Sequence, residues 1–205
     1  QLLTDIYPGS DNSFPVRFTE FNGQLFFSAN NGTTGRELWV TDGTPAGTQL
    51  LADINPGIDD SDPDDFIEIN GQLFFIANDG LTGDELWVTD GTPAGTQLLA
   101  DINPGIGRSD LNEFTAFNGQ LFFSANDGTT GRELWMTDGT PAGTQPVADI
   151  NPGIGGSSPR EITEFNSQLF FRANDGTSGT ELWVTDGTST GTQLVADINS
   201  GSGSS

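Results

Sequence analysis

Acidic side chains recur along this chain every 48 residues, and their type and spacing suit the binding of a hard cation. One set opens the segment Asp-Ile-Asn-Pro-Gly, and its members are Asp53, Asp101 and Asp149. A second set precedes a glycine in a short turn, and its members are Asp79, Asp127 and Asp175. Carboxylates, carbonyl oxygens and hydroxyls are the ligands that Ca²⁺ prefers. Serines follow the first set at a constant distance, at Ser61, Ser109 and Ser157. The pattern therefore predicts calcium as a cofactor, with the first set as the stronger candidate ligands.

The same Asp residues also have a purely structural interpretation. Asp and Asn side chains accept hydrogen bonds from the backbone of the turns they begin, so each carboxylate is also suited to cap its own turn. Neither segment matches an EF-hand or a nonapeptide calcium loop. The total charge favours cation binding, because 29 Asp and Glu residues outnumber 6 Arg residues and give a net charge of −23. An array this acidic gains from a bound cation in each copy.

Composition also excludes several classes of function. A net charge of −23 repels phosphate backbones, so we expect no nucleic-acid partner. Cysteine and histidine are absent, which removes thiolate and imidazole metal ligands and the usual general base near neutral pH. The longest apolar runs are only a few residues, so we expect no insertion into a membrane.

Catalysis is not expected from this pattern. A glycosidase needs two carboxylates at a defined separation in one cleft. The recurring carboxylates here each occur three to five times, whereas an active site needs one unique constellation. The six arginines are scattered over the repeat, and only Arg36 and Arg132 occupy equivalent positions, so they form no obvious cluster in sequence. We therefore predict that the protein is not an enzyme.

The positions of tryptophan define a tandem repeat, because Trp39, Trp87, Trp135 and Trp183 are separated by equal steps of 48 residues. No insertion or deletion interrupts the register. Such fidelity is typical of stacked or radial architectures. The predicted partition is residues 1–6 as the last strand of a preceding repeat, then repeats at 7–54, 55–102, 103–150 and 151–198, then a Gly/Ser-rich tail or start of a next link at 199–205.

Each repeat is predicted to contain four short strands. In the first repeat they span residues 18–21, 24–29, 37–41 and 48–54, and the pair Asn22-Gly23 is a two-residue hairpin signal between the first two. No segment has a sustained helical period. A longer link at 55–65 is long enough to run from one edge of a unit to the next. We therefore predict an all-β fold of four-stranded meanders, either β-propeller-like blades or an open β-repeat array or fibre.

The third strand and its turn carry a family resemblance. The segment Glu-Leu-Trp-Val-Thr-Asp-Gly-Thr at 37–44 recurs at 85–92, 133–140 and 181–188, with Met136 in place of valine in the third copy. This segment resembles the defining motif of the bacterial ELWxxDGT repeats, and the resemblance covers essentially the whole chain. It implies large secreted or cell-surface proteins with propeller-like repeats, and it implies no activity.

The ends of the chain bear on assembly. Residues 2–6 and 193–198 both match the fourth strand of a repeat, which gives five copies of that strand and four of each other strand. Either the array continues, or a spare strand completes a neighbouring molecule. We therefore predict that the terminal strands pair with further repeats or with another subunit. Apart from one Asp in each, these strands lack the Lys, Pro or bulge that usually blocks pairing at the edge of a sheet in a monomer.

Two hypotheses about the function follow from these patterns. The leading hypothesis is a structural extracellular or cell-surface repeat protein, stabilised by calcium, that associates with itself into a filament or long surface array. The alternative is a carbohydrate-binding or adhesive β-propeller module, in which the recurring tryptophans face outward and stack on sugar rings. The simpler expectation for these tryptophans is burial in the core.

Overall fold

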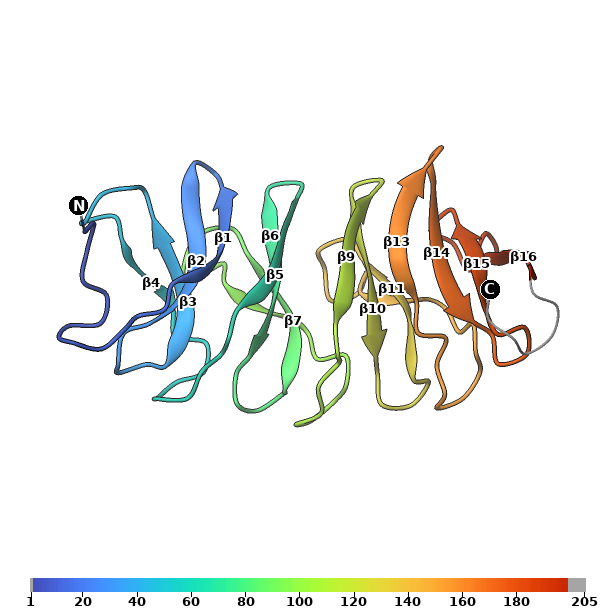
Figure 1. Ribbon diagram of the computed structural model, residues 1–205, viewed down its shortest axis with the longest axis horizontal. Helices are drawn as coiled ribbons and strands as arrows, with labels where there is room; N and C mark the ends of the chain where they lie inside the picture. The colour runs from blue at the N-terminus through green and yellow to red at the C-terminus, as the bar shows by residue number, and fades with distance from the viewer. Residues whose placement is uncertain (1, 199–205) are drawn as a thin grey trace. The chain divides into compact units, whose positions relative to one another are not determined.

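The computed structural model describes residues 2–198, and these residues form an all-β protein without a helix (Figure 1). Four antiparallel sheets follow one another along the chain, and each is a meander in which strands pair in sequence order. This confirms the predicted fold class of tandem four-stranded repeats. The described part of the chain contains no helix that is long and apolar enough to span a bilayer.

The chain divides into two compact units, one with residues up to Asp101 together with Gly105–Arg108, the other with Ile102–Pro104 and residues from Ser109 on. The first sheet is formed by β1 (Val16–Phe21), β2 (Gln24–Asn30), β3 (Arg36–Thr41) and β4 (Gln49–Ala52). The second is formed by β5 (Asp64–Ile69), β6 (Gln72–Asn78), β7 (Asp84–Thr89) and β8 (Gln97–Ala100). The third is formed by β9 (Asn112–Phe117), β10 (Gln120–Asn126), β11 (Arg132–Thr137) and β12 (Gln145–Ala148). The fourth is formed by β13 (Arg160–Phe165), β14 (Gln168–Asn174), β15 (Thr180–Thr185) and β16 (Gln193–Ala196).

The turns form where the sequence predicts them. Asn22 and Gly23 both have positive φ, at 50° and 74°, which is the geometry of the two-residue hairpin expected between β1 and β2. The turn after β3 is closed by Asp42, whose Oδ1 accepts hydrogen bonds from the backbone and the hydroxyl of Thr44 at 2.9 and 2.7 Å. A side chain at Gly47 would collide with this carboxylate, so the turn requires glycine there.

Within each unit two sheets pack face to face. In the first unit, Phe26, Leu38 and Val40 of the first sheet share a core with Phe75 and Trp87 of the second. In the second unit, the third and fourth sheets repeat this arrangement, with Leu134 against Phe171 and Trp183 among others. The first strands of the two sheets also approach each other, β1 with β5 and β9 with β13. The core is therefore a series of sheet-to-sheet layers.

The four tryptophans occupy equivalent buried sites. Trp39, Trp87, Trp135 and Trp183 are each 8–9% exposed, and the rings of Phe75 and Trp87 lie 6.5 Å apart. This confirms the expectation of a buried core position. The outward-facing arrangement considered for sugar stacking is not present.

Within one copy of the chain the fourth strand occurs once in each sheet, and the pairing of residues 2–6 with further repeats or another subunit stays a prediction. Residues 2–6 are not a strand. Instead Ile6 packs beside Phe27, Ala29 and Trp39 of the first sheet. A strand needs a neighbour with free backbone groups, and in the described residues every third strand already pairs with the fourth strand of its own sheet. The corresponding segment at the other end forms the shorter strand β16.

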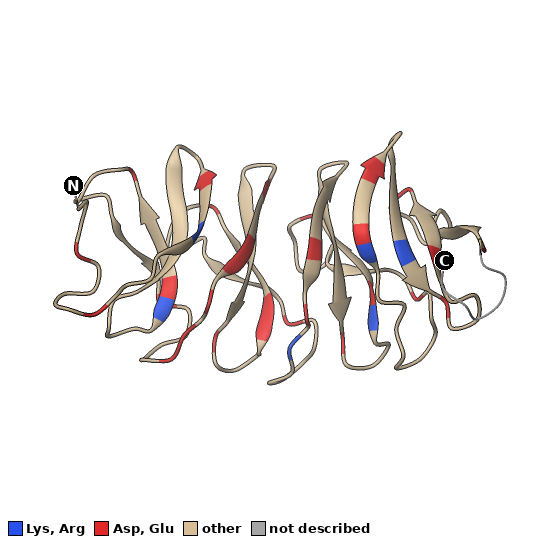
Figure 2. Cartoon of the chain, viewed as in Figure 1, with Lys and Arg blue, Asp and Glu red and all other residues tan. Residues whose placement is uncertain are grey.

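Charge is distributed over all four sheets. Figure 2 shows acidic residues in strands and loops throughout the chain and far fewer basic ones. Most of the arginines with a recorded partner pair with an Asp, as Arg17 does with Asp64 at 2.8 Å and Arg36 with Asp62 at 3.2 Å.

Candidate functional site

A buried glutamate marks the place where one sheet is joined to the next. Glu37, the first residue of the recurring Glu-Leu-Trp motif, is 0% exposed. Its Oε2 accepts hydrogen bonds from the backbone N–H of Ile54 at 2.7 Å and the hydroxyl of Ser61 at 2.6 Å. Its Oε1 accepts one from the backbone N–H of Ser61 at 3.1 Å. The carboxylate therefore holds the link that leaves its own sheet.

The serine of this link connects two sheets. Ser61 is bound on one side by Glu37, and its carbonyl accepts a hydrogen bond from the backbone N–H of Asn78 in the second sheet at 3.0 Å. The second unit repeats the contact: Ser157 donates its hydroxyl and its N–H to Glu133, and its carbonyl accepts from Asn174. We call this arrangement the Glu–Ser junction.

Burial and hydrogen bonding act on the junction glutamates in opposite directions. Burial in the low-dielectric interior raises the pKa of Glu37 to about 7, although the donors from Ser61, Ile54 and Asn55 lower it. Burial likewise raises the pKa of Glu133. All the surrounding groups donate, so the ionised carboxylate fits the hydrogen bonds, whereas burial favours the neutral acid.

The junction of the fourth sheet is incomplete among the described residues. Glu181 is 1% exposed, and its Oε2 accepts from the backbone N–H of Ile198 at 3.1 Å. Its Oε1 is buried and has no hydrogen-bond partner in residues 2–198. The repeat places the corresponding serine at position 205, which lies outside the described residues.

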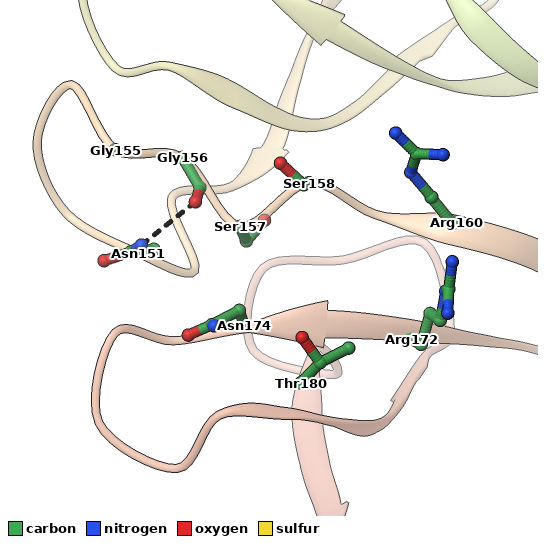
Figure 3. A pocket seen from close by; sticks show the side chains of 9 residues that line it. All are labelled: Asn151, Gly155, Gly156, Ser157, Ser158, Arg160, Arg172, Asn174 and Thr180. Carbon is green, nitrogen blue, oxygen red and sulfur yellow. Dashed lines mark hydrogen bonds between the residues drawn. The ribbon is translucent and has the colours of Figure 1, made fainter. Parts of the chain in front are cut away.

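A pocket of about 550 Å³ opens where the fourth sheet meets the preceding link, which carries Ser157 of the Glu133 junction (Figure 3). The sheet contributes Arg160, Arg172, Asn174 and Thr180, and the preceding link contributes residues 155–158 and Asn151. Figure 3 shows Arg160 and Arg172 together at one end and Asn151 and Asn174 at the other. The link is held by the amide of Asn151, which donates to the carbonyl of Gly156 at 2.9 Å.

Two arginines face each other in this pocket. Arg160 and Arg172 are directly opposite on paired strands, and like charges in that position repel. Arg172 lies 3.7 Å from Glu161, at a largely exposed site where screening makes the pair weak. The first and third sheets carry Ser28 and Ser124 at the position of Arg172. The pocket is therefore the most basic feature of an acidic protein.

The Asp residues predicted to bind calcium fall into two groups. Asp79, Asp127 and Asp175 cap their own turns: Oδ1 of Asp79 accepts from the backbone of Leu81 and Thr82 at 2.9 and 2.8 Å, and equivalent bonds occur at Asp127 and Asp175. These bonds lower the pKa of each carboxyl. Asp53, Asp101 and Asp149 are exposed. In residues 2–198 no group of three acidic side chains converges on one point.

Sequence reasoning missed the role of the motif glutamate. The serines expected to follow a cation loop are instead donors to that glutamate, as Ser61 is to Glu37. One signal was present: a Glu and a Ser recur 24 residues apart in every repeat. That spacing gains a meaning only when the path of the link is known.

Comparisons with known proteins show the fold and no family. No family model matches the sequence, and no curated protein is significantly similar to it. Among solved structures, a puromycin hydrolase is similar over 90% of this chain and 29% of its own, with 15% identity and a TM-score of 0.53. Oligopeptidase B from Leishmania major is similar over 88% of this chain and 26% of its own, with 13% identity and a TM-score of 0.51. The computationally designed Ika8 protein is similar over 98% of this chain and 54% of its own, with 18% identity and a TM-score of 0.48.

This chain therefore spans about half of one of these proteins and less than a third of the other two. At such low identity the likeness concerns a propeller-like fold alone. The hydrolytic activities belong to those proteins.

Proposed function

We propose that this chain is a structural, non-enzymatic repeat protein that associates with itself, face to face, into a filament or long array at the cell surface or outside the cell. The support comes from the way its sheets pack. Each unit is held together by the apolar face of one sheet on the next, and the same type of contact can be repeated between molecules. The resemblance of the motif to repeats of large secreted and surface proteins agrees with this location.

One observation carries the proposal. Within residues 2–198, one face of the fourth sheet, which we call its free face, exposes Phe165, Leu182, Val195 and Ile198 by 62%, 37%, 47% and 68%. The equivalent residues of the third sheet, Phe117, Leu134, Val147 and Ile150, are at most 8% exposed, and they lie in the core shared with the fourth sheet. The free face thus presents the residues that elsewhere form a sheet-to-sheet core.

The energy available from this face is comparable to the cost of association. Fully burying an exposed side chain of this kind contributes roughly 1.5–3 kcal/mol. Because these four are already about half-buried, completing their burial contributes on the order of 3–6 kcal/mol in total. The lower estimates of the entropic cost of bringing two proteins together begin at about 4 kcal/mol. Exposed apolar clusters of this kind mark interaction sites.

The test is the mass of the particle as a function of protein concentration. We expect wild-type chain to form oligomers or filaments in sedimentation velocity and electron microscopy, and Leu182→Glu to remain monomeric. Ile154→Glu is the matched control, because Ile154 is an isolated exposed residue of a link. A wild-type chain that stays monomeric up to the highest soluble concentration would overturn the proposal.

Calcium stabilisation is part of the proposal and rests on the acidic composition alone. A cation bound to the folded state raises its stability by mass action. We therefore expect calcium to raise the melting temperature and a chelator to lower it. If melting is indifferent to both, the Asp residues act only as turn caps.

Carbohydrate binding is the second candidate function. The pocket with Arg160 and Arg172 favours the binding of an acidic carbohydrate. Paired guanidinium groups with neighbouring amides and hydroxyls suit a sugar that carries a carboxylate. Calorimetric titration with an acidic oligosaccharide should then show binding that is lost in Arg172→Ser, which restores the residue of the first sheet. Binding that is equal in both proteins would exclude this site.

A further inference from the structure

A recess in the first unit lies between the first sheet and the link that leads into the second. The first sheet contributes Val16, Arg17, Ser28 and Arg36, and the link and the start of β5 contribute residues 62–64. The volume of the recess is about 500 Å³, within the roughly 300–1,000 Å³ that is usual for small-molecule sites. We call it the first-unit recess. Its size and its polar lining suit a small ligand.

A buried hydroxyl without a protein partner lines this recess. Ser28 is 1% exposed, and its Oγ has no hydrogen-bond partner in residues 2–198. Most buried polar side-chain atoms in proteins have one. The second sheet carries Ile76 at the equivalent position, so the sheet itself does not require a hydroxyl there. The Ser28 hydroxyl is therefore available to a molecule held in the recess.

The charges that line the recess balance one another. Nε of Arg17 lies 2.8 Å from Oδ1 of Asp64, and Nε of Arg36 lies 3.2 Å from Oδ1 of Asp62. Both pairs are partly exposed, and both use Oδ1, so Oδ2 of each carboxylate remains an acceptor for a ligand. Each guanidinium has further N–H donors. Because two positive and two negative charges cancel, the recess favours a neutral ligand with many hydrogen-bonding groups over a free cation or anion.

An apolar surface adjoins these polar groups. A smaller recess of about 250 Å³ shares Arg17 and Asp64 with the first and is also lined by Phe18 and Phe66. Phe18 is 56% exposed, and its ring lies against that of Phe27, with the ring centroids 5.6 Å apart. A sugar ring has hydroxyls at its edge and apolar C–H groups on its faces, and the C–H faces pack on aromatic rings. The two recesses together offer both kinds of contact.

We propose that the first-unit recess binds a neutral sugar. Hydroxyls of the sugar donate to the carboxylates of Asp62 and Asp64, and hydrogen bonds to such charged groups are stronger than those between neutral groups. Another hydroxyl bonds Oγ of Ser28, and a C–H face of the ring packs beside Phe18. This site goes beyond the proposed self-association and does not depend on it. Its balanced charge distinguishes it from the pocket with Arg160 and Arg172, which suits an acidic sugar.

The second unit has the buried hydroxyl without the carboxylates. Ser124 occupies the repeat position of Ser28, is 0% exposed, and its Oγ also has no partner in residues 2–198. Ser158 and Arg160 stand at the repeat positions of Asp62 and Asp64. Both carboxylate acceptors are thus replaced, one by a hydroxyl and the other by a guanidinium. Ser124 therefore provides a matched control for Ser28.

Ligand-detected NMR tests the site, because it reports weak binding of small sugars. The wild-type chain is titrated with glucose, galactose and mannose. We expect at least one of these hexoses to bind, Ser28→Ala to weaken its affinity roughly two- to tenfold, and Ser124→Ala to leave the affinity unchanged. Ser28→Ala removes a hydroxyl without a protein partner, so it should fold, and its melting temperature checks this. No binding of any of the three hexoses, or equal affinity in wild type and Ser28→Ala, would overturn the proposal.

Backbone amide shifts locate the bound sugar. With the hexose that binds, we expect shifts at Ser28, Arg36 and Asp64. Shifts confined to Arg160 and Arg172 would overturn the proposal and assign binding to the pocket of the fourth sheet. The methyl glycoside of the same hexose distinguishes the source of the ligand: shifts at the same residues indicate the end of a glycan, and loss of binding indicates the free sugar. A chain that binds the hexose and stays monomeric would support this site and overturn the proposed self-association, so the two proposals fail separately.

Discussion

At the scale of single residues, the motif glutamate holds the link that connects one sheet to the next. A carboxylate buried between sheets is costly, and Glu37 offsets the cost by accepting hydrogen bonds from the link that follows it. Because the accepting residue and the link belong to successive layers, Glu37 and Glu133 each fix the register of one sheet on the next within their own unit. Trp39, two residues further on, contributes buried apolar surface to the core, and the hydrogen bonds of Glu37 fix the path of the link.

The pKa of Glu37 gives a prediction with a defined sign. Burial raises this pKa from 4.5 to about 7, so between these pH values the folded protein binds more protons than the unfolded chain. The free energy of unfolding therefore falls as pH rises through that window, by at most about 3 kcal/mol from this group. Glu37→Gln removes the titration. Urea unfolding at pH 5 and pH 8 should show the stability difference, wild type minus variant, falling with pH.

The control for this measurement is Glu20→Gln, which removes the same charge from an exposed glutamate of the same sheet and leaves the buried carboxylate in place. A stability difference for Glu37→Gln that grows from pH 5 to pH 8 would contradict the assignment. That outcome would mean that the donors around the carboxylate outweigh its burial.

At the scale of elements, the turns were the most predictable part of the chain. Asn-Gly and Asp-Gly-Thr specify their backbone locally, through positive φ and side-chain capping, so the sequence was sufficient to place them. The strands between them follow, with bounds that differ by one or two residues. Residues 2–6 are not a strand within one copy of the chain, because strand formation depends on a partner, which is not a local property.

The Asp caps of these turns can be tested in a matched pair of variants. Oδ1 of Asp90 accepts from the backbone and hydroxyl of Thr92 at 2.8 and 2.7 Å, and these bonds lower its pKa. Asp90→Asn keeps the amide oxygen as an acceptor, whereas Asp90→Ala removes it. We expect the melting temperature of Asp90→Ala to fall below that of Asp90→Asn at neutral pH. Equal melting of the two variants would show that the cap contributes nothing.

At the scale of the whole molecule, the sequence predicted the repeat and left the interface hidden. The 48-residue period and the meander could be predicted because they depend on local sequence patterns. The Glu–Ser junction depends on the path of a long link, and the free face of the fourth sheet depends on which residues a neighbour covers. The sequence did indicate self-association, from an extra copy of the fourth strand. The structure instead directs attention to the faces of the sheets.

Ionic strength distinguishes the forces that act between copies. Each molecule carries a net charge of −23, so copies repel one another, while the proposed contact is largely apolar. The screening length is about 30 Å at 0.01 M salt and about 10 Å at 0.1 M. Raising sodium chloride from 0.01 to 0.15 M should therefore increase the mean particle mass in sedimentation velocity at fixed protein concentration. Leu182→Glu should stay small at both concentrations. Association that weakens with salt would instead assign the main attraction to ion pairs, with Arg160 and Arg172 as the cations that acidic residues of a second copy would approach.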